Sequence, residues 1–407
     1  MKAFLKKITL PWQMLIALLM ALLAGALVPS WMQYIEWTGE VFIRALRMIM
    51  VPLICTSLIT GVSGIESAGS LGRIGIKTLT YYLATSLLAI LTGLLLINIF
   101  RPGFNAGLTL DESVSIADIA DSTISETLIN IIPTNIFESL AGADMLPVIF
   151  FSLLFGFFIT KLKKPGRTML GSLFSNLFEL CMKITAFILR FAPIGIFGLV
   201  APMVASQGNV GSLMQNLGIY SAIVLGGLVI HAFITLPGLL SLIAKVNPFK
   251  HFRGVTTPLI TAFSTASSNA TLPFTMESVK NHSGVSDRIS SFTLPLGATL
   301  NMDGTALYEI VAAMFIAQVY GIDLTLGHQL QMVITALLAS IGAAGIPMAG
   351  MVMMALVLSV VGLPLEAVGL VMAVDPLLDR FRTAVNVWSD TCGSVIVAKS
   401  EKEELKV

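Results

Sequence analysis

The chain has 407 residues, of which 56% are hydrophobic and only 12% are charged, and its mean hydropathy is +0.89. A soluble globular chain carries about 25% charged residues, so the composition excludes an ordinary soluble domain and makes lipid the main solvent. The formal net charge of +1 gives no reason to expect a nucleic-acid partner. The three cysteines, Cys55, Cys181 and Cys392, are widely spaced and form no metal pattern. With no nucleophile–base pair or catalytic metal set in view, we do not expect an enzyme.

Long apolar runs occupy the first 250 residues, and several reach the length of about 20 residues that spans a bilayer core. We expect spanning helices near residues 11–30, 41–65, 76–100, 143–162, 170–204 and 212–244. The polar segment 105–135 is expected to form a long external loop.

Charge patterning gives the orientation. Basic residues gather in 2–7, 161–167 and 245–253, whereas Pro102–Glu126 carries acidic residues and no Lys or Arg. Because basic residues mark the cytoplasmic side, both termini are expected to be cytoplasmic. The short ends favour a prokaryotic plasma (inner) membrane.

The last 150 residues are apolar but interrupted. Ile260–Met276 (ITAFSTASSNATLPFTM) and Ile334–Gly350 (ITALLASIGAAGIPMAG) align without a gap. Paired, interrupted apolar segments point to a transporter binding site, since non-helical backbone at membrane depth is tolerated only where it is buried or lines a cavity. Two ordinary kinked helices are the alternative.

One apolar stretch near the C-terminus carries several ionisable groups on one helical face. Asp379, Thr383, Asn386 and Asp390 follow the spacing i, i+4, i+7 and i+11, and Arg382 flanks this stripe. These groups match an α-amino acid with an acidic side chain: Asp379 for the ammonium, Arg382 for the side-chain carboxylate, and Asn386 with Thr383 for the main-chain carboxylate. An internal Asp379–Arg382 salt bridge that only locks helices remains open.

A second polar group, Asn301 and Asp303 followed by Gly304, predicts a broken helix. Its oxygen ligands suit a hard cation such as sodium, and Asp390 offers a second anionic oxygen. Three hydroxyls at i, i+3 and i+4 add to the set: Tyr82, Thr85 and Ser86. Each hydroxyl alone is as well explained by a bond to its own helix carbonyl.

These residues carry a resemblance. NMDGTALYE (301–309), DRFRTAVNVWSD (379–390) and the two interrupted segments resemble the glutamate/aspartate transporter family, the dicarboxylate/amino acid:cation symporters that include the excitatory amino acid transporters. The match is strong over about 255–400 and looser at Met48–Gly64 and Leu71–Ser86. It implies an all-α membrane fold of eight transmembrane helices plus two re-entrant hairpins, near 255–282 and 326–360, arranged as inverted repeats in a homotrimer that works as an elevator.

The resemblance also implies a division of the chain. Scaffold helices 1–2 fall in 1–75, transport-domain helix 3 in 76–100, the external loop with scaffold helices 4–5 in 101–204, transport-domain helix 6 in 205–250, and the transport core (hairpin 1, helix 7, hairpin 2, helix 8) in 251–400.

Site residues follow from the same resemblance, position by position. The substrate site takes Ser268, Thr305, Asp379, Arg382, Thr383 and Asn386, with backbone near Ile346 at the external gate, whose tip is Ser340–Gly350. One sodium site takes Gly297, Asn301, Asn386 and Asp390; a second, mostly backbone, takes Thr299, Ser340, Ile341 and Ala343; a third takes Tyr82, Thr85, Ser86, Asn301 and Asp303.

Departures from the archaeal aspartate carriers point toward the animal pattern. Ala266 stands where those carriers have Arg, and Arg380 appears instead in the last helix. Glu309 matches the residue linked in animal transporters to proton and potassium coupling, and the resemblance implies a coupling role for Glu309 and Arg380, while whether these ions are coupled stays open. Asn269 replaces the last residue of the usual serine run, so the fine substrate preference is open, and Ala343 replaces an archaeal Thr.

Substrate choice rests on two residues. Relatives for neutral amino acids lack the Arg at 382, and relatives for C4-dicarboxylates replace the Asp at 379. This chain has both, so we expect a sodium-coupled symporter that imports glutamate or aspartate. A C4-dicarboxylate or neutral amino acid symporter of the same fold, a channel and a non-transporting sensor are the alternatives.

Overall fold

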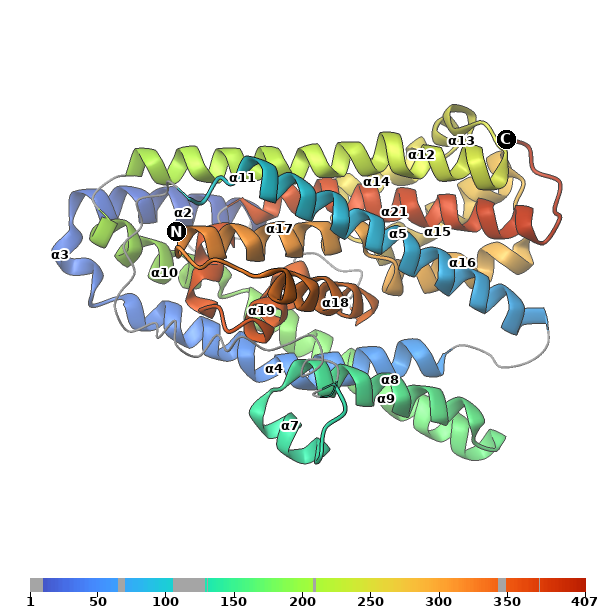
Figure 1. Ribbon diagram of the computed structural model, residues 1–407, viewed down its shortest axis with the longest axis horizontal. Coiled ribbons are helices and arrows are strands. Elements are labelled where there is room, and N and C mark those ends of the chain that lie inside the picture. Colours follow the sequence, from blue (N-terminus) through green and yellow to red (C-terminus); the bar gives the residue numbers. More distant parts are fainter. Residues whose placement is uncertain are drawn as a thin grey trace, which may run out of the picture.

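The structure is a computed structural model that describes residues 10–64, 70–104, 129, 131–207, 210–342, 349–372 and 374–407. Within these ranges every regular element is helical. The helices form an elongated bundle in which most of them run along the long axis (Figure 1). Most of the expected external loop, 105–135, lies outside the described residues.

The first half of the chain contains apolar helices where they are expected, with one exception. The described helices are α2 (Leu10–Leu27), α3 (Pro29–Met32), α4 (Glu36–Ser63), α5 (Ser70–Phe100), α7 (Ile136–Gly142), α8 (Met145–Lys161), α9 (Lys164–Leu189), α10 (Ala192–Gln207) and α11 (Val210–Ile230). The single helix expected over 170–204 is wrong, because α9 and α10 are separated at Arg190 and Phe191. Pro193 is the cause: it lacks the N–H that would bond to Leu189, and it suits the first turn of a new helix.

The second half is built from shorter pieces. In chain order these are η2 (His231–Thr235), α12 (Leu236–Leu239), η3 (Leu240–Ala244), α13 (Pro248–Gly254), α14 (Thr256–Thr265), α15 (Ser268–Ser278), η4 (Val279–Ser283), α16 (Asp287–Leu300), α17 (Asp303–Val319), α18 (Leu326–Gly342), α19 (Ala349–Val360), η5 (Leu365–Ala367), α20 (Val368–Met372) and α21 (Asp375–Ser400). Three of them, η2, η3 and η4, are single π-helical turns, a form that often occurs at functional sites.

Five helical segments in the described part of the chain are long and apolar enough to cross a membrane. They are Glu36–Ser63, Arg73–Phe100, Lys164–Leu189, Met214–Ala244 and Asp287–Val319. Shorter apolar helices cover Trp12–Leu27, Met145–Lys161 and Ala192–Pro202. The fold is therefore that of a multi-pass membrane protein.

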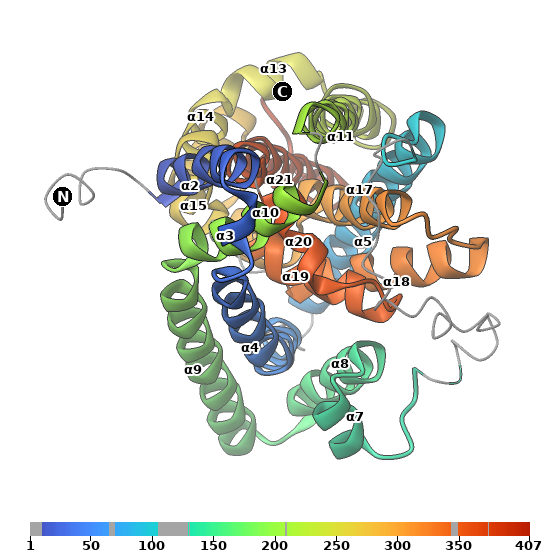
Figure 2. The same ribbon diagram turned by 90° about the vertical axis from the view of Figure 1, so that its left-hand side faces the viewer.

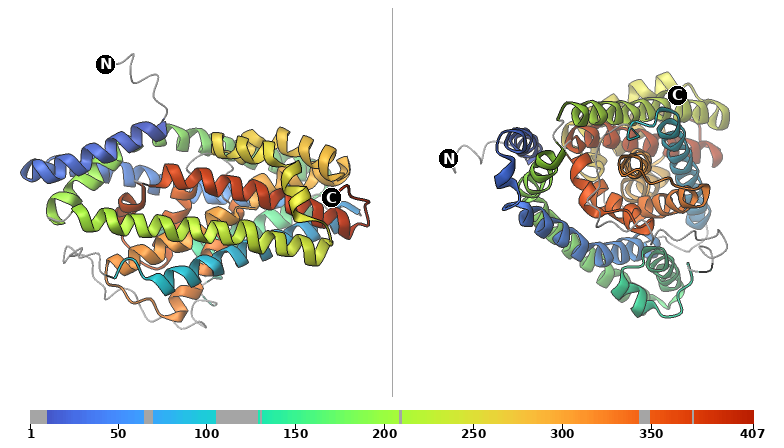
Figure 3. Two further views of the ribbon diagram at one scale, coloured as in Figure 1. Left: turned by 90° about the horizontal axis from the view of Figure 1, so that it is seen from above. Right: turned by 60° about the vertical axis from the view of Figure 1, so that its left-hand side comes forward.

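Helix α17 is the centre of the bundle. Every residue from Asp303 to Val319 is buried, although the segment holds both an Asp and a Glu. It packs against α5, α11, α18, α19 and α21, and Figures 2 and 3 show it enclosed by these elements. Helices α4, α8 and α9 pack on one another along one side of the molecule (Figure 2).

Two interruptions place polar groups inside this bundle. Ala266 (φ 50°) and Ser267 separate α14 from α15, and Asn301 with Met302 separates α16 from α17. Helices α14 and α15 have 10 and 11 residues, or about 15 Å each, half of a bilayer core. Residues 343–348, between α18 and α19, lie outside the described part.

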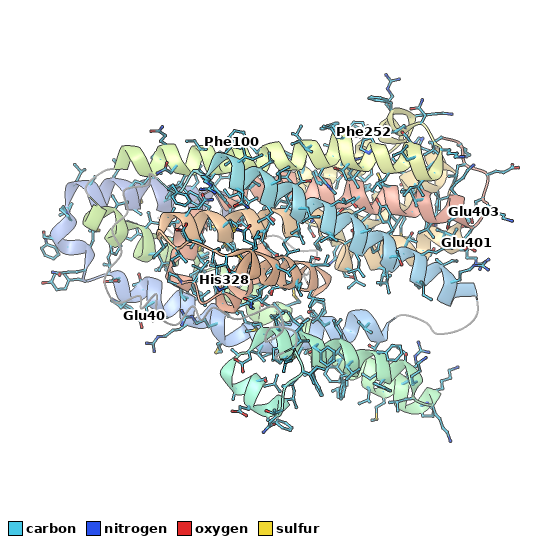
Figure 4. The ribbon with its side chains drawn as sticks, viewed as in Figure 1. Glu40, Phe100, Phe252, His328, Glu401 and Glu403 are labelled. Carbon is cyan, nitrogen blue, oxygen red and sulfur yellow. The ribbon has the colours of Figure 1, made fainter. Side chains whose placement is uncertain are left out.

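The C-terminal residues are tied back to the bundle. Glu401 forms ion pairs with Arg73 (2.5 Å) and Lys77 (2.6 Å) of α5, and hydrogen bonds from these two cations lower the pKa of Glu401 to about 2. Glu403 accepts a hydrogen bond from the backbone N–H of Ser286, just before α16. Glu401 and Glu403 mark this end of the molecule in Figure 4.

Candidate functional site

The break between α16 and α17 exposes backbone groups inside the protein. Asn301 (φ −108°, ψ 86°) and Met302 (φ −115°, ψ 52°) leave the helical region, which confirms the broken helix expected from the sequence. The first turn of α17 therefore has free N–H groups. One of them, on Gly304, donates to Oδ1 of Asn386 at 2.8 Å, which links the break to α21.

Glycine at 304 lets the two helices approach this closely. A Cβ at this position would lie 2.7 Å from the carbonyl oxygen of Arg382 and 2.9 Å from its Cα. Both are backbone atoms of α21 and cannot move aside easily. The Asp-Gly-Thr sequence thus brings the start of α17 against the substrate-site residues expected on α21.

Asp303 lies at the centre of a first cluster of polar side chains, which also contains Ser86, Ser389 and His231. Its Oδ1 accepts a hydrogen bond from Oγ of Ser86 (2.7 Å), and its Oδ2 accepts one from Oγ of Ser389 (2.6 Å). Nε2 of His231 lies 3.0 Å from the same Oδ2. All these side chains are buried, so α5, η2 and α21 meet at one carboxylate.

The other two hydroxyls expected here contact the cluster less directly. Oγ1 of Thr85 bonds to the carbonyls of Tyr81 (3.1 Å) and Tyr82 (3.2 Å) and lies 3.5 Å from Oδ1 of Asn301. The hydroxyl of Tyr82 donates to the carbonyl of Thr293 at 2.8 Å. Thr85 therefore makes the helix back-bonds that the sequence left open as an alternative, while still facing Asn301.

A second carboxylate cluster lies beside the first. Nδ2 of Asn301 donates to Oδ1 of Asp390 at 2.8 Å. A Cβ on Gly297 would collide with that carboxylate and would lie 2.6 Å from the Tyr82 hydroxyl. Three of the four residues expected in one sodium site thus lie together, and Asn386 joins them through Gly304.

The donor chemistry of both clusters fits a hard cation. The groups are carboxylates, amide oxygens, hydroxyls and the backbone of a broken helix. In the described residues no three His, Cys, Asp or Glu side chains gather as a metal site.

A buried arginine forms the third part of the site. Arg382 is fully buried, and its Nη2 lies 2.8 Å from Oδ1 of both Asp379 and Asp375. Its guanidinium carbon lies 3.7 Å from the ring centroid of Tyr308. Among the described residues nothing accepts a hydrogen bond from Nε or Nη1, although Gly350 at the start of α19 lies against Nη1.

The remaining described substrate-site residues lie on α15, α17 and α21, and both α15 and α17 pack on α21. Nδ2 of Asn386 lies 3.3 Å from Oγ1 of Thr305, and Oγ1 of Thr383 bonds to the carbonyl of Asp379 at 2.7 Å. Ser268 is buried at the first residue of α15, which packs on α21.

Glu309 and Arg380, expected together in ion coupling, are not in contact. Nη1 of Arg380 donates to the carbonyls of Phe263 (3.1 Å) and Ser264 (2.8 Å), near the C-terminal end of α14, where helix carbonyls lack partners. Glu309 is fully buried in α17, and no described residue bonds to its carboxyl oxygens.

The second expected sodium site is described only in part. Oγ1 of Thr299 bonds to the carbonyl of Leu296 (3.0 Å), and Oγ of Ser340 bonds to that of Leu337 (2.8 Å). Ile341 belongs to α18, but its side chain is outside the described part, as are Ala343 and Ile346 altogether.

Sequence reasoning missed Asp375, His231 and Ser389 as members of these clusters. Asp375 could have been found, because it precedes Asp379 by four residues and so continues the same helical stripe. His231 stands alone in an apolar run, and no spacing rule connects it to Asp303.

The similarity to known proteins extends over all of the helices that form this site. The model of the sodium:dicarboxylate symporter family matches residues 10–400. The chain is 36% identical to the "Proton/sodium-glutamate symport protein" of Geobacillus stearothermophilus, over 98% of this chain and 96% of the relative. It is 35% identical to "Excitatory amino acid transporter 3" of Oryctolagus cuniculus, over 100% and 88%. It is 34% identical to the "Proton/glutamate-aspartate symporter" of Escherichia coli (strain K12), over 97% and 93%.

Proposed function

Because the chain belongs to the sodium:dicarboxylate symporter family, we propose that it is a sodium-coupled symporter that imports an acidic amino acid, glutamate or aspartate. The observation that carries this proposal is the buried Arg382 with two carboxylates on one of its nitrogens and free donors on the others.

The geometry favours an exchange of partners on binding. Without substrate, Asp379 and Asp375 neutralise Arg382. A substrate carboxylate takes the free N–H donors of Arg382, and the substrate ammonium takes Asp379, while Asp375 continues to hold the guanidinium. Arg382 and Asp379 each keep a partner of opposite charge throughout this exchange, which avoids the large cost of an unpaired ion in the protein interior.

The two oxygen clusters supply the proposed coupling to sodium. A cation at either one offsets the charge of Asp303 or Asp390 in the membrane interior, where isolated charges are unfavourable. Both clusters also order the α16–α17 break. Since the first turn of α17, directly after that break, carries Thr305 and the Gly304 N–H that binds Asn386, its ordering prepares the substrate site.

The wider architecture belongs to the proposal as well. We take α14–α15 and α18–α19 as the two re-entrant hairpins, in addition to eight spanning helices, with the external gate at the α18–α19 tip. Residues 1–75 and 101–204 would form a scaffold in a homotrimer, and 76–100 with 205–400 the moving transport domain, with both termini in the cytoplasm. The short lengths of α14 and α15 and the burial of α17 support this division.

Glu309 is the proposed group for proton co-transport and potassium counter-transport.

Uptake into proteoliposomes tests the function. Labelled L-glutamate, L-aspartate, malate and a neutral amino acid are offered in sodium or in choline, with potassium inside; omitting internal potassium tests Glu309. We expect sodium-dependent accumulation of the acidic amino acids that Arg382→Ala abolishes. Arg44→Ala, at an exposed position, is the control and should leave uptake unchanged. Accumulation of malate or the neutral amino acid instead would reject the roles given to Asp379 and Arg382.

A further inference from the structure

A short helix projects from the bundle where a membrane span ends. The apolar segment Met214–Ala244 stops at Ala244, and Lys245 follows in the left-handed conformation (φ 54°). The side chain of Asn247 then caps α13 by accepting hydrogen bonds from the N–H groups of Phe249 and Lys250. The chain therefore leaves the span with a sharp, defined turn rather than continuing outward.

One face of α13 is fixed to the protein. His251 stacks on Trp388 with ring centroids 5.2 Å apart, and its two ring nitrogens contact Ser283 (2.8 Å) and Thr391 (3.2 Å). Phe252 also meets Trp388, edge to face at 5.2 Å. These contacts set the rotation of the helix about its axis.

The opposite face is apolar and cationic. Phe249 is 78% exposed, and Leu242, in the last turn of the span, is 79% exposed. Lys245, Lys250 and Arg253 are exposed beside them, and no ion pair in the described part of the chain involves any of the three. The sequence contains no Asp or Glu between Glu179 and Glu277, so this stretch of the chain offers them no carboxylate.

The orientation of α13 suits the surface of a bilayer. Seen along the long axis, α13 lies across the bundle between α14 and α11 (Figure 2), and Phe252 lies toward the same end as Glu401 and Glu403 (Figure 4). A helix at the end of a span and roughly perpendicular to it lies at headgroup level. There an exposed aromatic ring inserts among the acyl chains, and Lys and Arg extend to the phosphates.

We propose that Leu242, Lys245, Phe249, Lys250 and Arg253 form a binding surface for an anionic phospholipid. The aliphatic and aromatic side chains contact the acyl chains, and the three cations hold the headgroup phosphate. Because the fixed face of the same helix contacts Trp388 and Thr391 in the middle of α21, a bound lipid holds the helix that carries the substrate stripe. This lipid-binding surface depends only on α13 lying at the end of a membrane span. It can therefore be tested independently of which substrate the protein transports.

A local fluorescence probe tests the lipid preference. Bimane is attached at Thr256→Cys, an exposed position beside α13, in a Cys55→Ala background, and the full-length protein is placed in nanodiscs of phosphatidylcholine with a minority of phosphatidylglycerol. Bromine is carried on only one of the two lipids at a time. We expect brominated phosphatidylglycerol to quench more than its share of the membrane predicts. Changing Lys245, Lys250 and Arg253 to Gln should lower the relative affinity for phosphatidylglycerol by about fivefold per cation, which removes the enrichment.

The matched control replaces three exposed cations elsewhere, Lys161, Lys163 and Lys164, by Gln. It should leave the enrichment at the probe unchanged, and Phe249→Ser should reduce quenching by both lipids while keeping the charges. The proposal is overturned if the parent chain shows no enrichment of phosphatidylglycerol, if the first triple variant keeps it, or if the control triple lowers it equally. None of these readouts depends on transport.

Discussion

Replacing Asp379 by Asn separates the two interpretations of its contact with Arg382. If the pair only locks helices, the change weakens that lock, lowers stability and affects uptake of all substrates alike. If Asp379 is the ammonium partner, the protein stays folded, because Asp375 remains 2.8 Å from the same Nη2. Acidic amino acids then lose their partner, whereas a C4-dicarboxylate, which has no ammonium, does not.

The size of the effect follows from burial. The side chain of Asp379 is only 9% exposed, so the lost contact belongs to the buried class, for which removal of one partner costs about 2–5 kcal/mol. A loss of about 3 kcal/mol corresponds to an affinity about 100-fold weaker.

The assay is uptake of labelled glutamate into proteoliposomes, with succinate as the competing dicarboxylate, together with thermal unfolding of the purified protein. Asp323→Asn, at an exposed loop position, is the control for the loss of a carboxylate. We expect Asp379→Asn to shift selectivity from glutamate toward succinate without lowering the unfolding temperature much. A variant that unfolds, or that loses both substrates alike, would refute the ammonium role; unchanged glutamate affinity would refute it too.

Three further predictions follow from single contacts. Burial lowers the pKa of His251 from 6.5 to about 4, so as pH falls the unfolded chain binds a proton before the folded protein does. Unfolding experiments should therefore show a free energy of unfolding that is constant above pH 6.5 and falls by about 3 kcal/mol toward pH 4. His251→Gln should remove this slope. Ser86→Ala deletes the hydrogen bond to Asp303, a charged contact of about 1.5–3 kcal/mol, so half-maximal uptake should need about 10- to 100-fold more sodium. Thr92→Ala on the same helix removes only a bond to the carbonyl of Leu88 and should leave the sodium requirement unchanged. Equal effects of the two changes would contradict the site. Gly304→Ala should cost about 1–3 kcal/mol of stability and stop uptake. Gly226→Ala, whose added Cβ would meet nothing within 4 Å, should leave both stability and uptake unchanged.

Several local features of this protein could be predicted from its sequence. Composition and apolar runs predicted a helical membrane protein and the approximate positions of most helices, because a span needs a minimum apolar length whatever its neighbours are. The Asn301–Thr305 motif predicted the broken helix. The single helix predicted over 170–204 was wrong because Pro193 cannot donate to Leu189 and so begins a new helix.

The site shows the same division. The stripe from Asp379 to Asp390 follows from 3.6 residues per turn, and the same period extends it to Asp375. By contrast, the contact of His231 with Asp303 and the bonds from Arg380 to the end of α14 join residues that are far apart in the chain.

Sequence by itself thus determined that the chain is a helical membrane protein, and which polar residues share a helical face, because both depend on length and period along the chain. Tertiary structure alone decided that two carboxylates share Nη2 of Arg382, that Asp303 receives groups from three elements, and that Arg380 caps α14. These pairings depend on how the helices pack, and packing is set by side-chain contacts between distant segments that no local spacing encodes.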